Sequence, residues 1–224
     1  MRNKEHKQPA LEPQFRFIEQ SGGYYIDHRA DDAHKVLYLT FDAGYENGNV
    51  EKILDTLKAH RAPGAFFILD NLIRQNTDLV KRMAAEGHTV CNHTAKHKDM
   101  TKFTDKAAFA KELTALEEIY TEYTGNSMAK YYRPPEGKFS EENLQFANEL
   151  GYKTIFWSFA YADWDNDKQP DPAASLEKLK LHLHPGEVLL LHPTSATNAA
   201  ILDAFLTYAE QEGYRFGTLA ELCA

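Results

Sequence analysis

The stretch VLYLTFDAGYENG at residues 36–48 joins an apolar run to a polar loop that contains two glycines. Residues 36–41 are short, almost uniformly apolar and rich in aromatic and β-branched side chains, which predicts a strand buried on both faces. A helical pattern follows at residues 48–60. A buried strand followed directly by a helix indicates a βα unit of a parallel sheet.

The same alternation continues to the end of the chain. Further strands are predicted at 65–69, 88–91, 130–133, 153–157, 187–191 and 214–216, and further helices at 71–86, 104–124, 140–150, 172–183 and 197–212. Glycine follows four of the predicted helix ends, at Gly87, Gly125, Gly151 and Gly213, which is typical of helix C-termini. Seven strands without a GxGxxG phosphate loop favour a βα barrel over a doubly wound sheet.

Length and composition indicate one α/β domain and exclude several classes of protein. The chain has 224 residues, and its 25 Lys and Arg against 33 Asp and Glu give a net charge of −8, which argues against general nucleic-acid binding. Its apolar stretches are too short to span a membrane. Residues 1–35 are predicted to be an irregular N-terminal arm without a visible signal peptide, and residues 36–224 form the main domain.

Polar and titratable side chains follow five of the predicted strands. Active residues of βα barrels gather at the carboxyl ends of the strands, where the loops meet at one rim. The residues at these positions are Asp42, His93, His97, Arg133, Asp163, Trp164 and His192. Their convergence at one rim is the main reason to predict an enzyme.

Each of these residues also has a structural interpretation. His93 and His97, four apart, could share one helical face and one metal ion, but the chain has ten histidines and such a pair also arises by chance. Asp42 could be a general base, a metal ligand or a turn-forming residue. Arg133, held extended by the prolines that follow it, could bind a carboxylate bidentately or lie on the surface.

The last two strand ends leave similar alternatives. His192 closes an apolar strand and needs a partner there, for which Asp163 is a candidate, although His192 could also be purely structural. Trp164 lies in a long irregular stretch at residues 161–172 and could form the wall of a sugar site or simply pack.

Taken together, these motifs resemble the polysaccharide deacetylase, or NodB homology, domain of the family 4 carbohydrate esterases. The resemblance covers residues 36–223 and rests on five motifs in the family's order. They are Thr40-Phe41-Asp42 for TFDD, His93-x-x-x-His97 for H(S/T)xxH, Arg133-Pro-Pro-Glu136-Gly137 for RPPxG, Asp163-Trp164 for the end of DxxDW, and Leu190-x-His192 for LxH.

The resemblance implies a distorted (β/α)7 barrel that removes acetyl groups from polysaccharides. His93 and His97 would bind a divalent metal, zinc or another first-row ion. Ala43 replaces the aspartate that normally supplies the third ligand, so we expect weaker metal binding. The first aspartate of the DxxDW motif is likewise replaced, by Ala160.

The resemblance also implies roles for the remaining motif residues. Asp42 would be the catalytic base, oriented by Arg133, and His192 would be the acid, tuned by Asp163. The substrate-binding residues would be Glu136 through its backbone amide, and Trp164 and Leu190 around the acetyl group.

The sequence GYENG at residues 44–48 resembles the δ-lactam-biosynthetic de-N-acetylase subgroup, in which the second aspartate is also commonly absent. This subgroup implies N-acetylmuramic acid of peptidoglycan as substrate, muramic δ-lactam in the spore cortex as product, and an extracytoplasmic location. Deacetylation of N-acetylglucosamine polymers is the alternative activity. A sugar-binding module that has lost catalysis is the alternative of another class, against which the retained base and acid argue.

Overall fold

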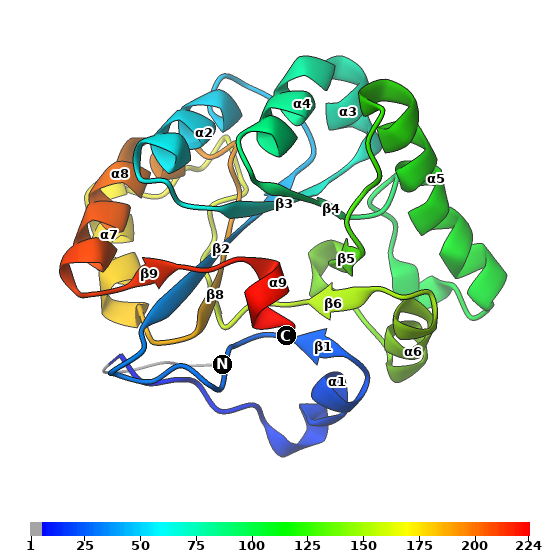
Figure 1. The fold of residues 1–224 in the computed structure, drawn as a ribbon, viewed down its shortest axis with the longest axis horizontal. Helices are drawn as coiled ribbons and strands as arrows, with labels where there is room; N and C mark the ends of the chain where they lie inside the picture. Colours follow the sequence, from blue (N-terminus) through cyan, green and yellow to red (C-terminus); the bar gives the residue numbers. More distant parts are fainter. Residues whose placement is uncertain (1–5) are drawn as a thin grey trace.

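The computed structural model describes residues 6–224, which form a curled parallel sheet surrounded by helices (Figure 1). The strands follow the order β1-β6-β5-β4-β3-β2-β8-β7, and β9 pairs with β2. Their bounds are β1 Gly23–Tyr24, β2 Val36–Ala43, β3 Gly64–Ile68, β4 Thr89–Asn92, β5 Tyr131–Tyr132, β6 Lys153–Ile155, β7 Phe159–Ala160, β8 Glu187–Leu191 and β9 Arg215–Phe216. All of these strand pairs are parallel, as the βα alternation predicts.

Strand β2 lies at the centre of the sheet. It pairs with β3 through Thr40 opposite Ala65 and with β8 through Thr40 opposite Leu190, so both of its edges are used. Seven of its eight residues are buried, and Asp42 is partly exposed. The continuous apolar run of the sequence therefore reflects a strand covered on both faces.

The helices lie around the outside of the sheet (Figure 1). Their bounds are α1 Phe17–Gln20, α2 Val50–Ala59, α3 Asp70–Gln75, α4 Thr77–Ala85, α5 Lys106–Thr124, α6 Glu141–Glu149, α7 Pro172–His182, α8 Ala196–Gln211 and α9 Leu219–Leu222, with short 3-10 turns η1 Pro13–Phe15, η2 Met100–Lys102 and η3 Pro135–Gly137. Asp105 caps α5 by accepting a hydrogen bond from the backbone of Ala108, and Gly125 ends it with a φ of 76°. Within residues 6–224, no helix combines the length and the apolar character that crossing a membrane requires.

The barrel is distorted between β6 and β7. These two strands are consecutive in the chain but are not neighbours in the sheet, because β6 pairs with β1 and β7 pairs with β8. The backbone of Phe156 donates to Tyr24, whereas that of Ser158 donates to Val188, so the chain changes partners within three residues. The seven strands β2 to β8 thus form a distorted (β/α)7 barrel, as predicted, but β7 takes the place of the predicted strand at 214–216, which is β9 and lies off the main strand order.

The structure also departs from the predicted elements. The single helix predicted at 71–86 is two helices, α3 and α4, because Asn76 interrupts it with φ −136° and ψ 49°. Strands β1 and β7 were not predicted, whereas the equally short β5 and β9 lie within the predicted runs at 130–133 and 214–216. Of the predicted arm, residues 1–5 lie outside the described part, and the rest adds α1 and β1 to one edge of the sheet.

Candidate active site

The carboxyl ends of the strands bring together most of the residues that the sequence singled out. Asp42 at the end of β2 lies 2.8 Å from Arg133 beyond β5 and 3.5 Å from His93 beyond β4. His192, beyond β8, lies close enough to Asp42 for each to affect the pKa of the other. Strand-end placement therefore predicted a real cluster of titratable groups.

Arg133 is fully buried and holds Asp42 in place. Its Nη1 donates to Oδ1 of Asp42 at 2.8 Å, and its Nη2 donates to Thr40 Oγ1 at 2.8 Å and to the carbonyl of Phe156 at 3.1 Å. Its Nε donates to the carbonyl of Ile155 at 2.9 Å. The expected bidentate contact is therefore not formed, because one side of the guanidinium is occupied by Thr40 and by backbone carbonyls.

The environment of Asp42 favours its ionised form. Burial alone would raise the pKa of this carboxyl group, but the charge of Arg133, together with His93 and His192, lowers it below the ordinary value. An ionised carboxylate that receives a hydrogen bond on one oxygen keeps the other free to accept a proton. Asp42 can therefore act as a base.

His93 and His97 lie close together, but not on a helix. They belong to the loop between β4 and η2, in which Thr94 and His97 have left-handed φ values of 71° and 52°. Thr94 donates its backbone N–H to Oδ1 of Asn92 at 2.8 Å, and its Oγ1 accepts from the backbone of His97 at 3.0 Å. The expected shared helical face was wrong because these local bonds replace helical ones. The two rings are nevertheless only 5.0 Å apart between centroids.

The histidine pair fits a metal site with two nitrogen donors. Nδ1 of His93 lies 2.8 Å from the carbonyl of Arg133 and must donate to it, which leaves Nε2 as a free electron-pair donor. Burial lowers the pKa of His93 to about 4, so the ring is neutral, as a metal ligand must be. Ala43 is fully buried among apolar side chains and adds no donor. Residues 6–224 contain no group of three or more His, Cys, Asp and Glu arranged to hold a metal.

The environment of His192 favours its charged, protonated form. Its Nδ1 lies 2.7 Å from Oδ1 of Asp163, and Oδ2 of Asp163 accepts from the backbone of His192 at 2.8 Å and from Nδ2 of Asn198 at 2.6 Å. Burial alone would lower the pKa of His192, but the hydrogen bond and charge of Asp163, together with Asp42, raise it. The protonated ring is therefore favoured, and its Nε2–H is not engaged by Asp163.

Of the three expected substrate-binding residues, Trp164 and Leu190 lie near His192, and Glu136 lies three residues beyond Arg133. Glu136 in η3 has a left-handed φ of 57°, and its exposed carboxylate pairs with Lys138 at 2.9 Å. Leu190 is buried in β8, whereas Trp164 is 60% exposed, with its ring 6.1 Å from that of His192. The left-handed backbone of Glu136 is of the kind that clusters at functional sites.

Sequence analysis missed Thr40 and Asn198 as parts of the site. Thr40 donates to the carbonyl of Leu189 at 2.7 Å and accepts from Arg133, so it links β2, β8 and the guanidinium. Asn198, in the first turn of α8, donates to both Asp163 and the carbonyl of His192. A threonine in a wholly apolar strand was a usable signal, whereas nothing in the sequence distinguished Asn198.

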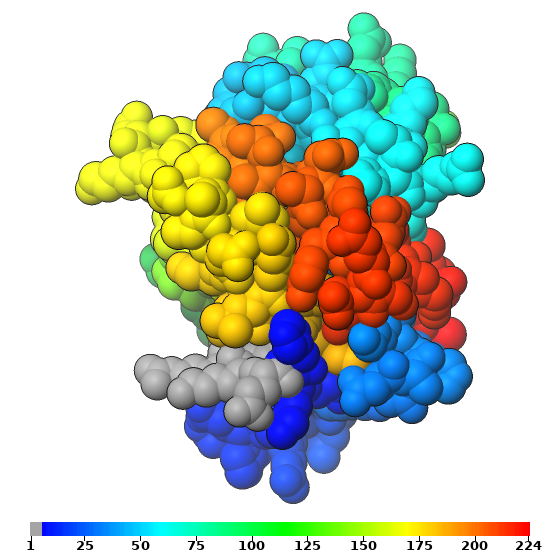
Figure 2. Space-filling model, turned by 90° about the vertical axis from the view of Figure 1, so that its left-hand side faces the viewer, coloured from blue at the N-terminus to red at the C-terminus, as the bar shows by residue number. Residues whose placement is uncertain are grey.

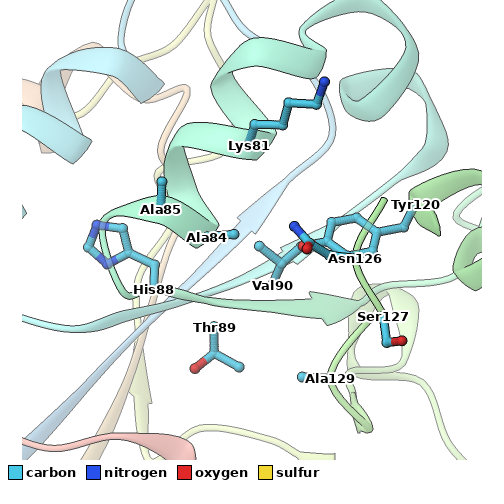
Figure 3. Close-up of a pocket in the computed structure, with 10 residues that line it drawn as sticks. All are labelled: Lys81, Ala84, Ala85, His88, Thr89, Val90, Tyr120, Asn126, Ser127 and Ala129. Atoms are coloured by element: carbon cyan, nitrogen blue, oxygen red, sulfur yellow. The ribbon is translucent and has the colours of Figure 1, made fainter. Parts of the chain in front are cut away.

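A pocket of about 580 Å³ lies elsewhere, between α4, the start of β4 and the end of α5 (Figure 3). It is lined by Lys81, Ala84, Ala85, His88, Thr89, Val90, Tyr120, Asn126, Ser127 and Ala129. These residues lie near the amino end of β4, away from Asn92, which leads to the histidine loop. The chemistry of the strand ends, and not this hollow, identifies the candidate site.

Comparison with known proteins agrees with the strand-end chemistry. The family model described as polysaccharide deacetylase matches residues 29–155. The chain belongs to the polysaccharide deacetylase family. It is 37% identical over 222 residues to the peptidoglycan-N-acetylmuramic acid deacetylase PdaA of Bacillus subtilis, covering 99% of this chain and 83% of that protein. The structure of PdaA, a family 4 carbohydrate esterase, superposes with a TM-score of 0.92 and covers 99% of this chain and 94% of that one.

Two further relatives of this polysaccharide deacetylase differ in activity. A peptidoglycan-N-acetylglucosamine deacetylase of Bacillus cereus is 31% identical over 188 residues, covering 82% of this chain and 66% of that protein. A family 4 pseudoenzyme of Bacillus anthracis is 25% identical, with a TM-score of 0.79, and covers 90% of this chain and 69% of that one. The family thus contains an N-acetylglucosamine deacetylase and a pseudoenzyme besides PdaA.

Proposed function

We propose that this protein is a hydrolase that removes the N-acetyl group from N-acetylmuramic acid residues of peptidoglycan. The observation that carries the proposal is the pair Asp42 and His192, whose surroundings shift their pKa values in opposite directions. The surroundings favour the ionised form of Asp42 and the protonated form of His192, which is the arrangement that general base and general acid catalysis require. The similarity to PdaA supports the muramoyl substrate.

In this mechanism, Asp42 accepts the proton of the water that attacks the acetamide carbonyl. Arg133 keeps the accepting carboxylate fixed through the 2.8 Å bond to its Oδ1. His192 then donates its Nε2 proton to the nitrogen of the leaving amine. Asp163 stabilises the charged ring before transfer and fixes Nδ1 as the donor that faces it.

The remaining residues would bind the acetyl group and the developing oxyanion. The backbone N–H of Glu136 would donate to the oxyanion, and Leu190 and Trp164 would contact the acetyl group. His93 and His97 would hold a divalent metal ion, zinc or another first-row metal. When bound, that ion would supply Lewis-acid polarisation of the carbonyl. With Ala43 in place of a third protein ligand, we expect this binding to be weak.

The direct test is release of acetate from de-peptidylated glycan strands, with Asp42→Asn as the inactive comparison. Acetate release by the parent and its loss in the variant are expected. Absence of release with every divalent metal supplied would refute the proposal. Elemental analysis of the purified protein, run in parallel, identifies the metal that accompanies activity.

Deacetylation of N-acetylglucosamine polymers is the second candidate, favoured by the similarity to the Bacillus cereus enzyme. The ratio of kcat/KM on muramoyl and glucosaminyl glycans distinguishes the two. A non-catalytic sugar-binding protein is the third candidate, and the pseudoenzyme among the relatives shows that a member of the family can lack catalysis. Against it, Asp42 and His192 both retain the charged partners that a binding role does not need. Full function of Asp42→Asn would favour the binding role.

The proposed substrate also implies where the protein acts. Peptidoglycan lies outside the cytoplasm, so we expect an extracytoplasmic location in the cell wall or spore envelope. The amine freed on muramic acid can attack the neighbouring lactyl carboxylate and close a δ-lactam. Mass spectrometry of the treated strands would detect this ring by the loss of water that follows the loss of the acetyl group.

A further inference from the structure

Tyr45 is an exposed aromatic residue three positions beyond the proposed base. In the part of the chain that the structure describes, four large apolar side chains are exposed: Phe15, Tyr45, Trp164 and Leu181. Trp164 already lies beside His192, and Tyr45 extends from the adjoining β2–α2 loop with 42% of its surface exposed. Two exposed aromatic side chains on loops of one rim offer flat apolar faces with polar edges, on which a ligand can stack.

The hydroxyl of Tyr45 is held by another loop of the same rim. It accepts a hydrogen bond from Nδ2 of Asn166, which lies in the long loop at residues 161–172. Figure 2 shows this loop in yellow, standing out from the surface beside α8 in orange. Asn166 is itself exposed, so the bond does not draw the tyrosine into the core. The contact fixes the ring while leaving it accessible.

The backbone that carries Tyr45 is also anchored. Nδ2 of Asn47 and Nδ2 of Asn49 both donate to the carbonyl of Thr194, at 2.8 and 3.0 Å. Thr194 lies two residues beyond His192, so this anchoring ties the tyrosine loop to the loop that carries the acid. A side chain fixed before binding loses little conformational entropy when a ligand arrives.

Glu46 completes the anchoring at the start of α2. Its Oε2 accepts from the backbone of Glu51 at 3.2 Å, and its Oε1 accepts from the backbone of Gly48. The polar residues of the GYENG segment therefore have structural partners within the rim. The ring of Tyr45 stays exposed in this segment, as do Asn47 and Gly48.

We infer that Tyr45 is a specificity-determining side chain that stacks on a sugar ring next to the residue being deacetylated, with Asn166 as its positioning residue. A pyranose presents a face of C–H groups to a flat aromatic ring, and a tyrosine offers such a ring on a surface that stays wet. An acetylated monosaccharide bound at Asp42 has no neighbouring sugar, so it would not contact Tyr45. This inference rests on the proposed function, because it takes the ligand to be a glycan strand.

Binding of de-peptidylated glycan strands by isothermal titration calorimetry tests the inference without turnover. All proteins carry Asp42→Asn, and the variants are Tyr45→Ala, Tyr45→Phe, Asn166→Ala and, as an exposed aromatic whose ring packs against Phe139 and not against Asn166, Phe15→Ala. We expect Tyr45→Ala to raise the Kd by about tenfold and Phe15→Ala to leave it unchanged. Tyr45→Phe and Asn166→Ala should each raise it by about threefold, because both leave the ring but free it from its partner.

Two further measurements make the outcome decisive. Circular dichroism melting of each variant shows whether the barrel is intact. In the Asp42-containing protein, Tyr45→Ala should raise KM more on long strands than on a disaccharide and change kcat less than KM. An unchanged Kd in Tyr45→Ala, or an equal loss on long and short ligands, would overturn the inference.

The outcomes also separate this inference from the proposed function. Acetate release by the parent with normal strand binding by Tyr45→Ala would refute the stacking role alone. Weakened binding by Tyr45→Ala without acetate release by the parent would refute the proposed activity and retain the stacking surface. Failure of the parent to bind strands at all would refute the stacking role as well.

Discussion

Replacing Asp163 by Asn removes the negative charge behind the proposed acid while changing little in volume. The carboxylate now accepts three hydrogen bonds, from Nδ1 and the backbone of His192 and from Nδ2 of Asn198. In the variant, the new amide NH2 has two possible orientations. If it takes the place of Oδ2, it faces the backbone N–H of His192 and Nδ2 of Asn198, so that donors face donors. If it takes the place of Oδ1, it faces Nδ1 of His192, and in both cases the imidazolium has lost its counter-ion.

The expected loss of stability follows from these contacts. Asp163 is fully buried, and a buried hydrogen-bonding group left without a partner costs about 1–3 kcal/mol. Losing the charge and one or two of three bonds should lower the free energy of unfolding by about 3 kcal/mol. For a chain of this size, that corresponds to a fall in Tm of about 6–12 °C.

The effect on activity has a definite direction in pH. Asp163 raises the pKa of His192, so the protonated acid persists to higher pH and activity is lost as pH rises through that raised value. Asp163→Asn removes the cause, so the alkaline limb of the kcat profile should move to lower pH. In the plateau, kcat should fall by about 10²–10⁴, the usual contribution of a general acid.

The assay is acetate release measured across pH, together with thermal melting of the same preparations. Asp165→Asn, an identical change at an exposed position two residues away, serves as the control and should alter neither measurement. An alkaline limb that stays in place in Asp163→Asn would show that His192 is not the group that must be protonated. A loss of Tm with an unshifted limb would leave Asp163 a purely structural role.

Other substitutions test the neighbouring parts of the site. His97→Ala should lower both the metal content measured by elemental analysis and acetate release; retention of both would make the histidine structural. Gly137→Ala should lower the free energy of unfolding by about 1–3 kcal/mol in urea, since φ is 65° and a Cβ would lie 2.6 Å from the ring of Trp157; an unchanged midpoint would contradict this. Arg133→Met should cost about 3–5 kcal/mol by the same measurement, because it leaves Asp42 buried without its partner, and a neutral effect would mean that the carboxyl protonates instead.

The sequence predicted the regular part of the barrel because that part has a local cause. A strand such as β2 is apolar throughout since both of its faces are covered, and α5 ends at Gly125 because a left-handed residue is needed there. Strand β7 has no such signal: it is two residues long and exists because β8 offers it an edge. The break between α3 and α4 depends on a single backbone conformation at Asn76, which no periodicity records.

In the candidate site, too, some residues could be placed from the sequence and others could not. Asp42, Arg133 and His192 could be placed at one rim, since every parallel strand points its carboxyl end in one direction. The arrangement of His93 and His97 could not, because Thr94 adopts a left-handed φ of 71° that a β-branched residue rarely takes. Spacing predicts a shared face only where the backbone is regular.

Arg133 joins the two halves of the proposed chemistry. Its guanidinium holds the carboxylate of Asp42, and its backbone carbonyl accepts a hydrogen bond from Nδ1–H of His93, which leaves Nε2 of that ring with a free electron pair. Thr40 and the carbonyls before β7 fix the guanidinium from the other side, so the whole connection depends on the packed barrel. A substitution that shifts the backbone at Arg133 therefore disturbs the base and the histidine pair together. Separating their contributions requires changes at Asp42 and His97 themselves, combined in a double-mutant cycle.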